Sequence, residues 1–153
     1  GHAIMGILSN DFDDIEKVSV LPRGSAGGVT VFVPDENAID GWYTKAYLLK
    51  KIRVGLGGHA AEEIVYGVDN VTNGAVSDFE LVANIATTMV KRFGFSDVGK
   101  FAVPNDASQE TKTLVDQAVR DIIEREYRHV KFTLDRPIFF HLFTVNIEKI
   151  ISC

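Results

Sequence analysis

A helical stretch with three glycines at its centre constrains the fold of this chain more than any other feature. Apolar residues recur every three to four positions from Thr44 to about Tyr66, the spacing of a helix that buries one face. Gly55, Gly57 and Gly58 lie in its middle, and each glycine costs a helix about 1 kcal/mol relative to alanine. Because the apolar period continues in phase beyond them, we expect an unbroken helix that another backbone approaches closely.

The rest of the pattern predicts a mainly α fold, a helical domain with a small antiparallel β ribbon near the N-terminus. The ribbon is expected to pair residues 15–21 with residues 29–33, which are rich in β-branched residues and separated by glycine-rich loop sequence. Helices are expected over residues 1–9, 44–66, 78–93, from about 108 or 111 to 134, and within 138–151. The chain of 153 residues shows no repeat and no linker, so we expect a single domain over 1–153.

Composition and charge exclude several classes of protein. Hydrophobic residues make up 46% and charged residues 24%, which is typical of a folded domain. The net charge of −5 gives no electrostatic basis for binding nucleic acid or an anionic membrane. No apolar run approaches the roughly 20 residues of a membrane span. The only cysteine is Cys153, so no internal disulfide can form, which fits the cytosol, mitochondrial matrix or plastid stroma.

One motif in the sequence imitates a phosphate-binding loop. Residues Gly94 to Lys100 have the spacing G-x-x-x-x-G-K, but Phe101 stands where that motif requires serine or threonine. The segment also follows a predicted helix, whereas a phosphate-binding loop follows a strand. We therefore expect a helix end and a surface loop here.

Three places in the sequence offer metal-binding or acid–base chemistry, and the residues at each also have a purely structural alternative. Asp78 follows a glycine-containing loop and begins a predicted helix, where a carboxylate commonly caps backbone N–H groups. His2 lies in an apolar helical segment, where a single histidine is usually packed and hydrogen-bonded. His59 shares a helix with Glu62 and Glu63, at least one of which must face solvent.

Taken in chain order, several segments resemble the FtsH family of membrane-anchored, ATP-dependent zinc metalloproteases. Gly1-His2-Ala3 is similar to the end of the family element H-E-A-G-H-A. Other similar segments are residues 18–24, 28–34, 57–67 and 72–79, the last being Thr-Asn-Gly-Ala-Val-Ser-Asp-Phe beside the family's T-T-G-A-S-N-D-L. The family more often has arginine at the position of His59. The resemblance covers roughly residues 1–134 and leaves 135–153 as a divergent tail.

The resemblance implies an incomplete zinc site in this chain. Histidines four apart on a helix share one face and can bind one zinc, and the glutamate of H-E-x-x-H accepts a proton from the attacking water. The resemblance makes His2 the second ligand and Asp78 the third. It places the first histidine and the general-base glutamate just before Gly1, so no catalytic residue lies in this chain. Glu62 or Glu63 in place of Asp78, or His59 as a ligand, are less favoured alternatives.

The resemblance also implies what the whole protein does. It would be a metalloendopeptidase with upstream membrane spans and an ATPase module, where ATP would bind. It would form a homo- or hetero-hexamer and degrade unfolded or membrane proteins, with this domain on the soluble side of a plastid, mitochondrial or bacterial inner membrane. One alternative is a proteolytically inactive homologue that serves as an assembly or chaperone-like subunit. Another is a helical interaction domain of similar structure only.

We predict that the 153-residue chain by itself binds zinc weakly and has no peptidase activity. A catalytic zinc normally has three protein ligands, and loss of a general base alone typically costs about 10²–10⁴ in rate. Metal content after dialysis and hydrolysis of casein check both statements. A purified chain that kept one zinc and cleaved casein would contradict them.

Overall fold

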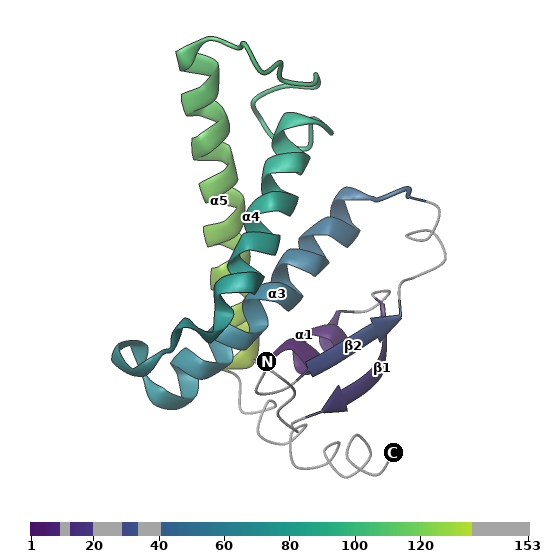
Figure 1. Ribbon diagram of the computed structural model, residues 1–153, viewed down its shortest axis with the longest axis vertical. Helices are drawn as coiled ribbons and strands as arrows, with labels where there is room; N and C mark the ends of the chain where they lie inside the picture. The colour runs from purple at the N-terminus through teal and green to yellow at the C-terminus, as the bar shows by residue number, and fades with distance from the viewer. Residues whose placement is uncertain (10–12, 20–28, 34–40, 136–153) are drawn as a thin grey trace.

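The computed structural model describes residues 1–9, 13–19, 29–33 and 41–135. Within these residues the chain is mainly helical with one two-stranded sheet, as the sequence predicts (Figure 1). The elements in chain order are α1 (His2–Leu8), β1 (Asp14–Ser19), β2 (Val29–Val33), α3 (Lys45–Tyr66), the 3₁₀ turns η1 (Val68–Asn70) and η2 (Asn73–Ala75), α4 (Val76–Lys91) and α5 (Gln109–Leu134). The helix predicted within 138–151 lies outside the described residues.

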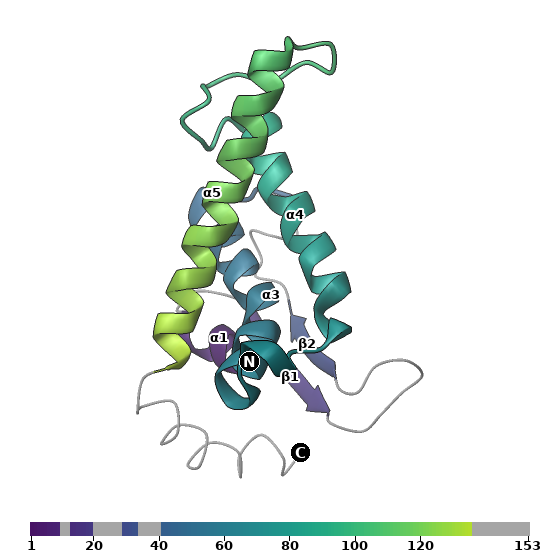
Figure 2. The same ribbon diagram turned by 90° about the vertical axis from the view of Figure 1, so that its left-hand side faces the viewer.

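Helix α3 lies at the centre of the helical packing. It contacts α1, α4 and α5, and α4 and α5 also contact each other but diverge toward the bottom of Figure 2. The core between these helices consists of aliphatic side chains and methionines that are almost fully buried, including Met5, Ile52, Leu56, Val82, Met89, Val130 and Leu134. Helices α4 and α5 are amphipathic, and their apolar positions face this shared core, whereas α3 buries residues on several sides because it packs against α1, α4 and α5.

The β ribbon packs beside α1. Strands β1 and β2 are antiparallel, with Asp14 opposite Val33 and Ser19 opposite Val29. Phe32 is packed against the core, and its ring lies so close to Gly6 of α1 that a side chain at Gly6 would meet it at 2.7 Å. A two-stranded ribbon is marginal in water, so this packing on α1 supplies the support it needs.

The glycines of α3 permit two close helix contacts, and the helix continues through them without a break. A Cβ atom on Gly58 would lie 2.3 Å from Cε1 of His2, and one on Gly57 would lie 3.1 Å from the carbonyl carbon of Gly1. On another face of α3, a Cβ atom on Gly55 would lie 2.9 Å from Cγ2 of Val82 in α4. The predicted close approach is therefore confirmed, and it involves both α1 and α4.

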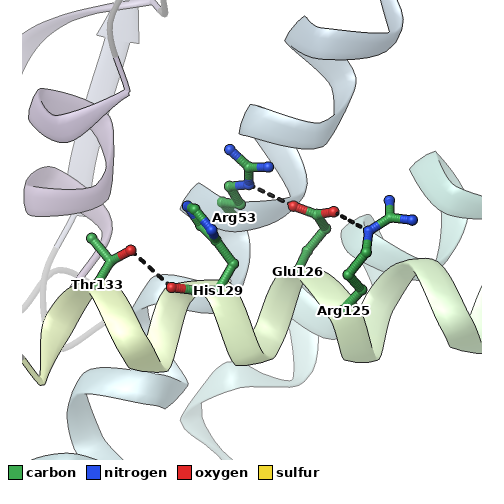
Figure 3. A network of polar contacts seen from close by, with 5 residues as sticks. All are labelled: Arg53, Arg125, Glu126, His129 and Thr133. Atoms are coloured by element: carbon green, nitrogen blue, oxygen red, sulfur yellow. Dashed lines mark hydrogen bonds and ion pairs between the residues drawn. The ribbon is translucent and has the colours of Figure 1, made fainter.

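A buried carboxylate joins α3 to α5 (Figure 3). Glu126 is only 2% exposed, and its two oxygens accept hydrogen bonds from Nε of Arg53 at 2.5 Å and from Nε of Arg125 at 2.9 Å. Partial burial and the nearby charge of Arg53 lower the pKa of His129, against the opposite effect of Glu126. A lowered pKa favours the neutral form of His129 beside the ion pairs.

We predict that Glu126→Ala destabilises the domain by about 2–3 kcal/mol, because it leaves the guanidinium of Arg53 partly buried without its partner. The matched control is Glu124→Ala on the exposed side of the same helix, which should change the free energy of unfolding by less than about 0.5 kcal/mol. Urea denaturation of both variants checks the difference. Equal stabilities would show that the buried network contributes nothing.

Candidate metal site

The structure brings together two of the residues singled out in the sequence, His2 and Asp78. His2 is the first residue of α1, and Asp78 lies in the first turn of α4. Nε2 of His2 lies 3.1 Å from Oδ2 of Asp78, although the residues are 76 positions apart. Both side chains are about one-third exposed, at 32% and 29%. The pair is therefore fixed by tertiary packing and remains accessible from solvent.

The alternative interpretation of Asp78, as the N-cap of its helix, is wrong. Helix α4 begins at Val76, two residues earlier than predicted, so its N-cap is Ala75, which makes no side-chain cap hydrogen bond. Asp78 is the third residue of the helix and directs its carboxylate to His2. A carboxylate in the first turn still interacts favourably with the positive end of the helix dipole.

The histidine of this pair is positioned by the glycines of α3. The ring of His2 lies directly against Gly58, where a side chain would collide with Cε1, Nδ1 and Nε2. The backbone of Gly1 lies in the same way against Gly57. Because any larger residue at Gly58 would displace the ring, this crossing of α1 and α3 sets where Nε2 meets Asp78.

The geometry of the pair fits two ligands of a tetrahedral metal. Ligand bonds of about 2.0–2.2 Å at a tetrahedral angle place neighbouring donor atoms about 3.4 Å apart, close to the observed 3.1 Å. Imidazole nitrogen and carboxylate oxygen are both zinc donors. Within the described residues, no group of three or more histidine, cysteine, aspartate or glutamate side chains could hold a metal ion. The described part of the chain therefore offers two donors.

The two glutamates of α3 have other partners. Glu62 accepts a hydrogen bond from the backbone N–H of Thr72 at 3.2 Å, which ties the loop before α4 to α3. Glu63 accepts hydrogen bonds from Nζ of Lys131 at 2.7 Å and from the hydroxyl of Tyr127, both on α5. These hydrogen bonds lower the pKa of Glu63, while burial and Glu63 itself raise the pKa of Tyr127. The carboxylate in contact with His2 is that of Asp78.

His59 lies beside this arrangement in an aromatic setting. Its ring meets the ring of Phe79 edge-on at 4.9 Å between centroids and lies 6.0 Å from that of Tyr127. Its Nδ1 atom is buried and has no hydrogen-bond partner among the described residues.

Sequence reasoning missed the Tyr127–Lys131 pair that holds Glu63. Its only signal was the spacing of four residues on one helix face, which does not identify a partner across an interface.

The apparent phosphate-binding loop is a helix end, as expected. Helix α4 ends at Lys91, and Gly94 adopts a φ of 62° in the turn that follows. Nζ of Lys100 donates a hydrogen bond to the carbonyl of Gly94 at 3.1 Å. The lysine of the motif therefore stabilises the loop backbone.

Comparison with known proteins decides the family. The profile of Peptidase family M41 matches residues 1–138. The chain belongs to peptidase family M41. It is 38% identical to a chloroplastic ATP-dependent zinc metalloprotease FTSH of Capsicum annuum over 97% of this chain and 25% of that protein. It is 39% identical to the chloroplastic FTSH 5 of Arabidopsis thaliana (97% and 24%) and 38% identical to FtsH 3 of Synechocystis (97% and 27%).

This M41 chain spans about a quarter of the length of those curated relatives. The names of these relatives describe zinc metalloproteases that depend on ATP, which bears out the resemblance to FtsH proteins. Among the helices that the structure describes, none combines the length and the apolar character needed to cross a bilayer.

We predict that Glu63→Gln makes this M41 domain less stable at pH 7 by about 1 kcal/mol, since the ion pair with Lys131 is partly exposed. The folded-state pKa of Glu63 is lowered from 4.5, so its contribution is present above pH 4.5 and is lost as pH falls through the lower value. Free energies of unfolding between pH 7 and pH 3 should show the gap between wild type and variant closing at acidic pH. A stability difference that widened at acidic pH would contradict the stabilising role assigned to the ionised Glu63.

Proposed function

We propose that this domain is the peptidase part of a zinc metalloendopeptidase, with His2 and Asp78 as two of the protein ligands. The contact of 3.1 Å between Nε2 and Oδ2 across the α1–α4 interface is the observation that carries the proposal. It is supported by membership of family M41 and by relatives whose names specify zinc metalloproteases. A histidine and an aspartate held at this separation are suited to share one metal ion.

The remaining ligand and the general base would come from residues that precede Gly1 in the parent protein. The carbonyl of Gly1 already accepts a hydrogen bond from Met5 N–H at 3.0 Å, so Gly1 takes part in the hydrogen bonding of α1. If the helix extends by one turn, a histidine four residues before His2 lies on the same face. A glutamate next to it is then placed to take a proton from a water at this site.

The residues of the chain itself have defined roles in this proposal. Nε2 of His2 and Oδ2 of Asp78 would face the same metal ion, while Gly58 leaves room for the imidazole ring. Bound zinc would polarise the peptide carbonyl and acidify a coordinated water. The one-third exposure of both ligands leaves space for a polypeptide to reach the pair. The ring of His59 packs edge-on against that of Phe79, the residue that follows Asp78 in α4.

The parent protein is proposed to be an ATP-dependent protease of unfolded or membrane proteins. The ATP dependence is supported by the names of the relatives, and ATP would bind outside this domain. Chloroplast and cyanobacterial relatives support a membrane-associated parent in a plastid or bacterial setting. Membrane anchoring and a hexameric ring rest on the resemblance to FtsH proteins, and this domain would then lie on the soluble side.

We predict that the chain extended by the parent residues before Gly1 binds about one zinc, and that Asp78→Asn weakens this binding more than about 100-fold. Loss of an outer-sphere partner alone costs about 10–100-fold, so loss of a direct ligand should cost more. Zinc content and the absorption spectrum of the cobalt-substituted protein measure the site independently of activity, and casein hydrolysis measures the function.

The matched control is Glu80→Gln, which removes an exposed carboxylate two residues along the same helix. It should leave metal affinity and casein hydrolysis unchanged. An extended chain without the His-Glu pair, or one that binds no zinc, would overturn the protease proposal and favour the inactive assembly subunit. Equal metal affinity in Asp78→Asn and wild type would remove Asp78 from the ligand set.

A further inference from the structure

A groove of about 480 Å³ lies between the C-terminal half of α4, the N-terminal half of α5 and the loop that joins them. It lies at the opposite end of α4 from Asp78, at the top of Figure 1. Its lining includes three basic side chains and three valines, namely Lys91, Lys112, Arg120, Val103, Val115 and Val119. We refer to it as the basic groove.

The walls of the basic groove are fixed by hydrogen bonds of the connecting loop. The loop returns to the end of α4, where the N–H of Val103 donates to the carbonyl of Lys91 at 2.8 Å and that of Phe95 to Met89 at 2.9 Å. Val103 and Val115 are buried at 9% and 5% exposure and form part of the core. The groove is thus part of the folded domain, and a ligand would find it preformed.

Basic side chains outnumber acidic ones in the lining of the groove by three to one. In the described part of the chain, Lys91, Lys112 and Arg120 take part in none of the ion pairs, which involve other basic residues. Asp116 is the only acidic residue in the lining, and it is also unpaired there. The groove is therefore a positively charged site on a chain whose net charge is −5. Such a site attracts an anionic partner.

We propose that the basic groove binds an acidic polypeptide segment at a site separate from His2 and Asp78. Carboxylates of the segment lie against Lys91, Lys112 and Arg120, while an apolar side chain between them rests on the valines. Guanidinium and ammonium groups bind carboxylates by charge-assisted hydrogen bonds, which strengthen where an apolar floor excludes water. The proposal concerns binding only and does not require that His2 and Asp78 hold a metal.

Two features of the lining favour a polypeptide over a free phosphate. Asp116 lies between Lys112 and Arg120 on α5, one helical turn from each, and would repel a compact dianion. The Asp116 carboxylate can accept a hydrogen bond from a peptide N–H, and the side chains of Thr87 and Asn105 can donate to peptide carbonyl groups. The apolar floor adds an attraction that inorganic phosphate cannot use.

The test is a fluorescence anisotropy titration of the 153-residue chain with a labelled octapeptide that alternates glutamate and leucine. We expect saturable binding that weakens as salt is raised, and at least about tenfold weaker binding of peptides with glutamine for glutamate or serine for leucine. The double variant Lys112→Gln, Arg120→Gln should weaken binding by about tenfold or more. Both residues are exposed, so the variant should fold, which its thermal unfolding curve checks.

Arg128→Gln provides a control that removes one positive charge elsewhere on the same helix, because Arg128 is exposed on α5 outside the groove. It should leave the affinity unchanged. An equal loss in this control would show non-specific attraction and overturn the proposal, as would the absence of saturable binding. Displacement of the peptide by millimolar inorganic phosphate at constant ionic strength would assign the groove to phosphate and overturn it as well.

Discussion

The absence of side chains on two faces of α3 is the constraint on which the rest of the structure depends. At Gly57 and Gly58 the start of α1 comes into contact with the α3 backbone, and at Gly55 the side chain of Val82 in α4 does so. These two close contacts bring the first turns of α1 and α4 together. His2 and Asp78 are 76 positions apart in the chain, so their contact depends on these two helix crossings. Three costly helix positions thus bring together the two proposed metal ligands.

Helix α5 fixes α3 from another direction through two acidic residues. Glu126 is nearly fully buried and binds Arg53 of α3, whereas Glu63 of α3 binds Tyr127 and Lys131 of α5. A buried ion pair is weak support for overall stability, because removing its charges from water offsets much of the attraction. Its directional hydrogen bonds nevertheless favour one axial register of the two helices. Since Arg53 lies about one turn from Gly57, this register also holds the face of α3 on which His2 rests.

Much of the fold could be predicted from the sequence, because periodic apolar positions and glycines report on local structure directly. The course of α3 and its close contacts, the paired strands and the end of α4 before Gly94 all followed from such patterns. The partners of Glu63 and Glu126 could not be predicted, since pairing across an interface depends on the rotation of each helix about its axis. The start of α4 was misplaced for a related reason. An aspartate after a glycine-containing loop suggests a cap, but Ala75 occupies that position and Asp78 faces α1 instead.

Helix α4 connects the proposed metal site with the proposed peptide-binding groove. Asp78 lies in the first turn of α4 and Lys91 in its last turn, thirteen residues later, which corresponds to about 20 Å along the helix. An extended polypeptide covers that distance with about six residues. A segment held by its acidic part in the basic groove would therefore present residues only a few positions away to His2 and Asp78. Because α4 is buried along one side by Val82, Ala86 and Met89, this spacing is set by the core and does not depend on a flexible loop.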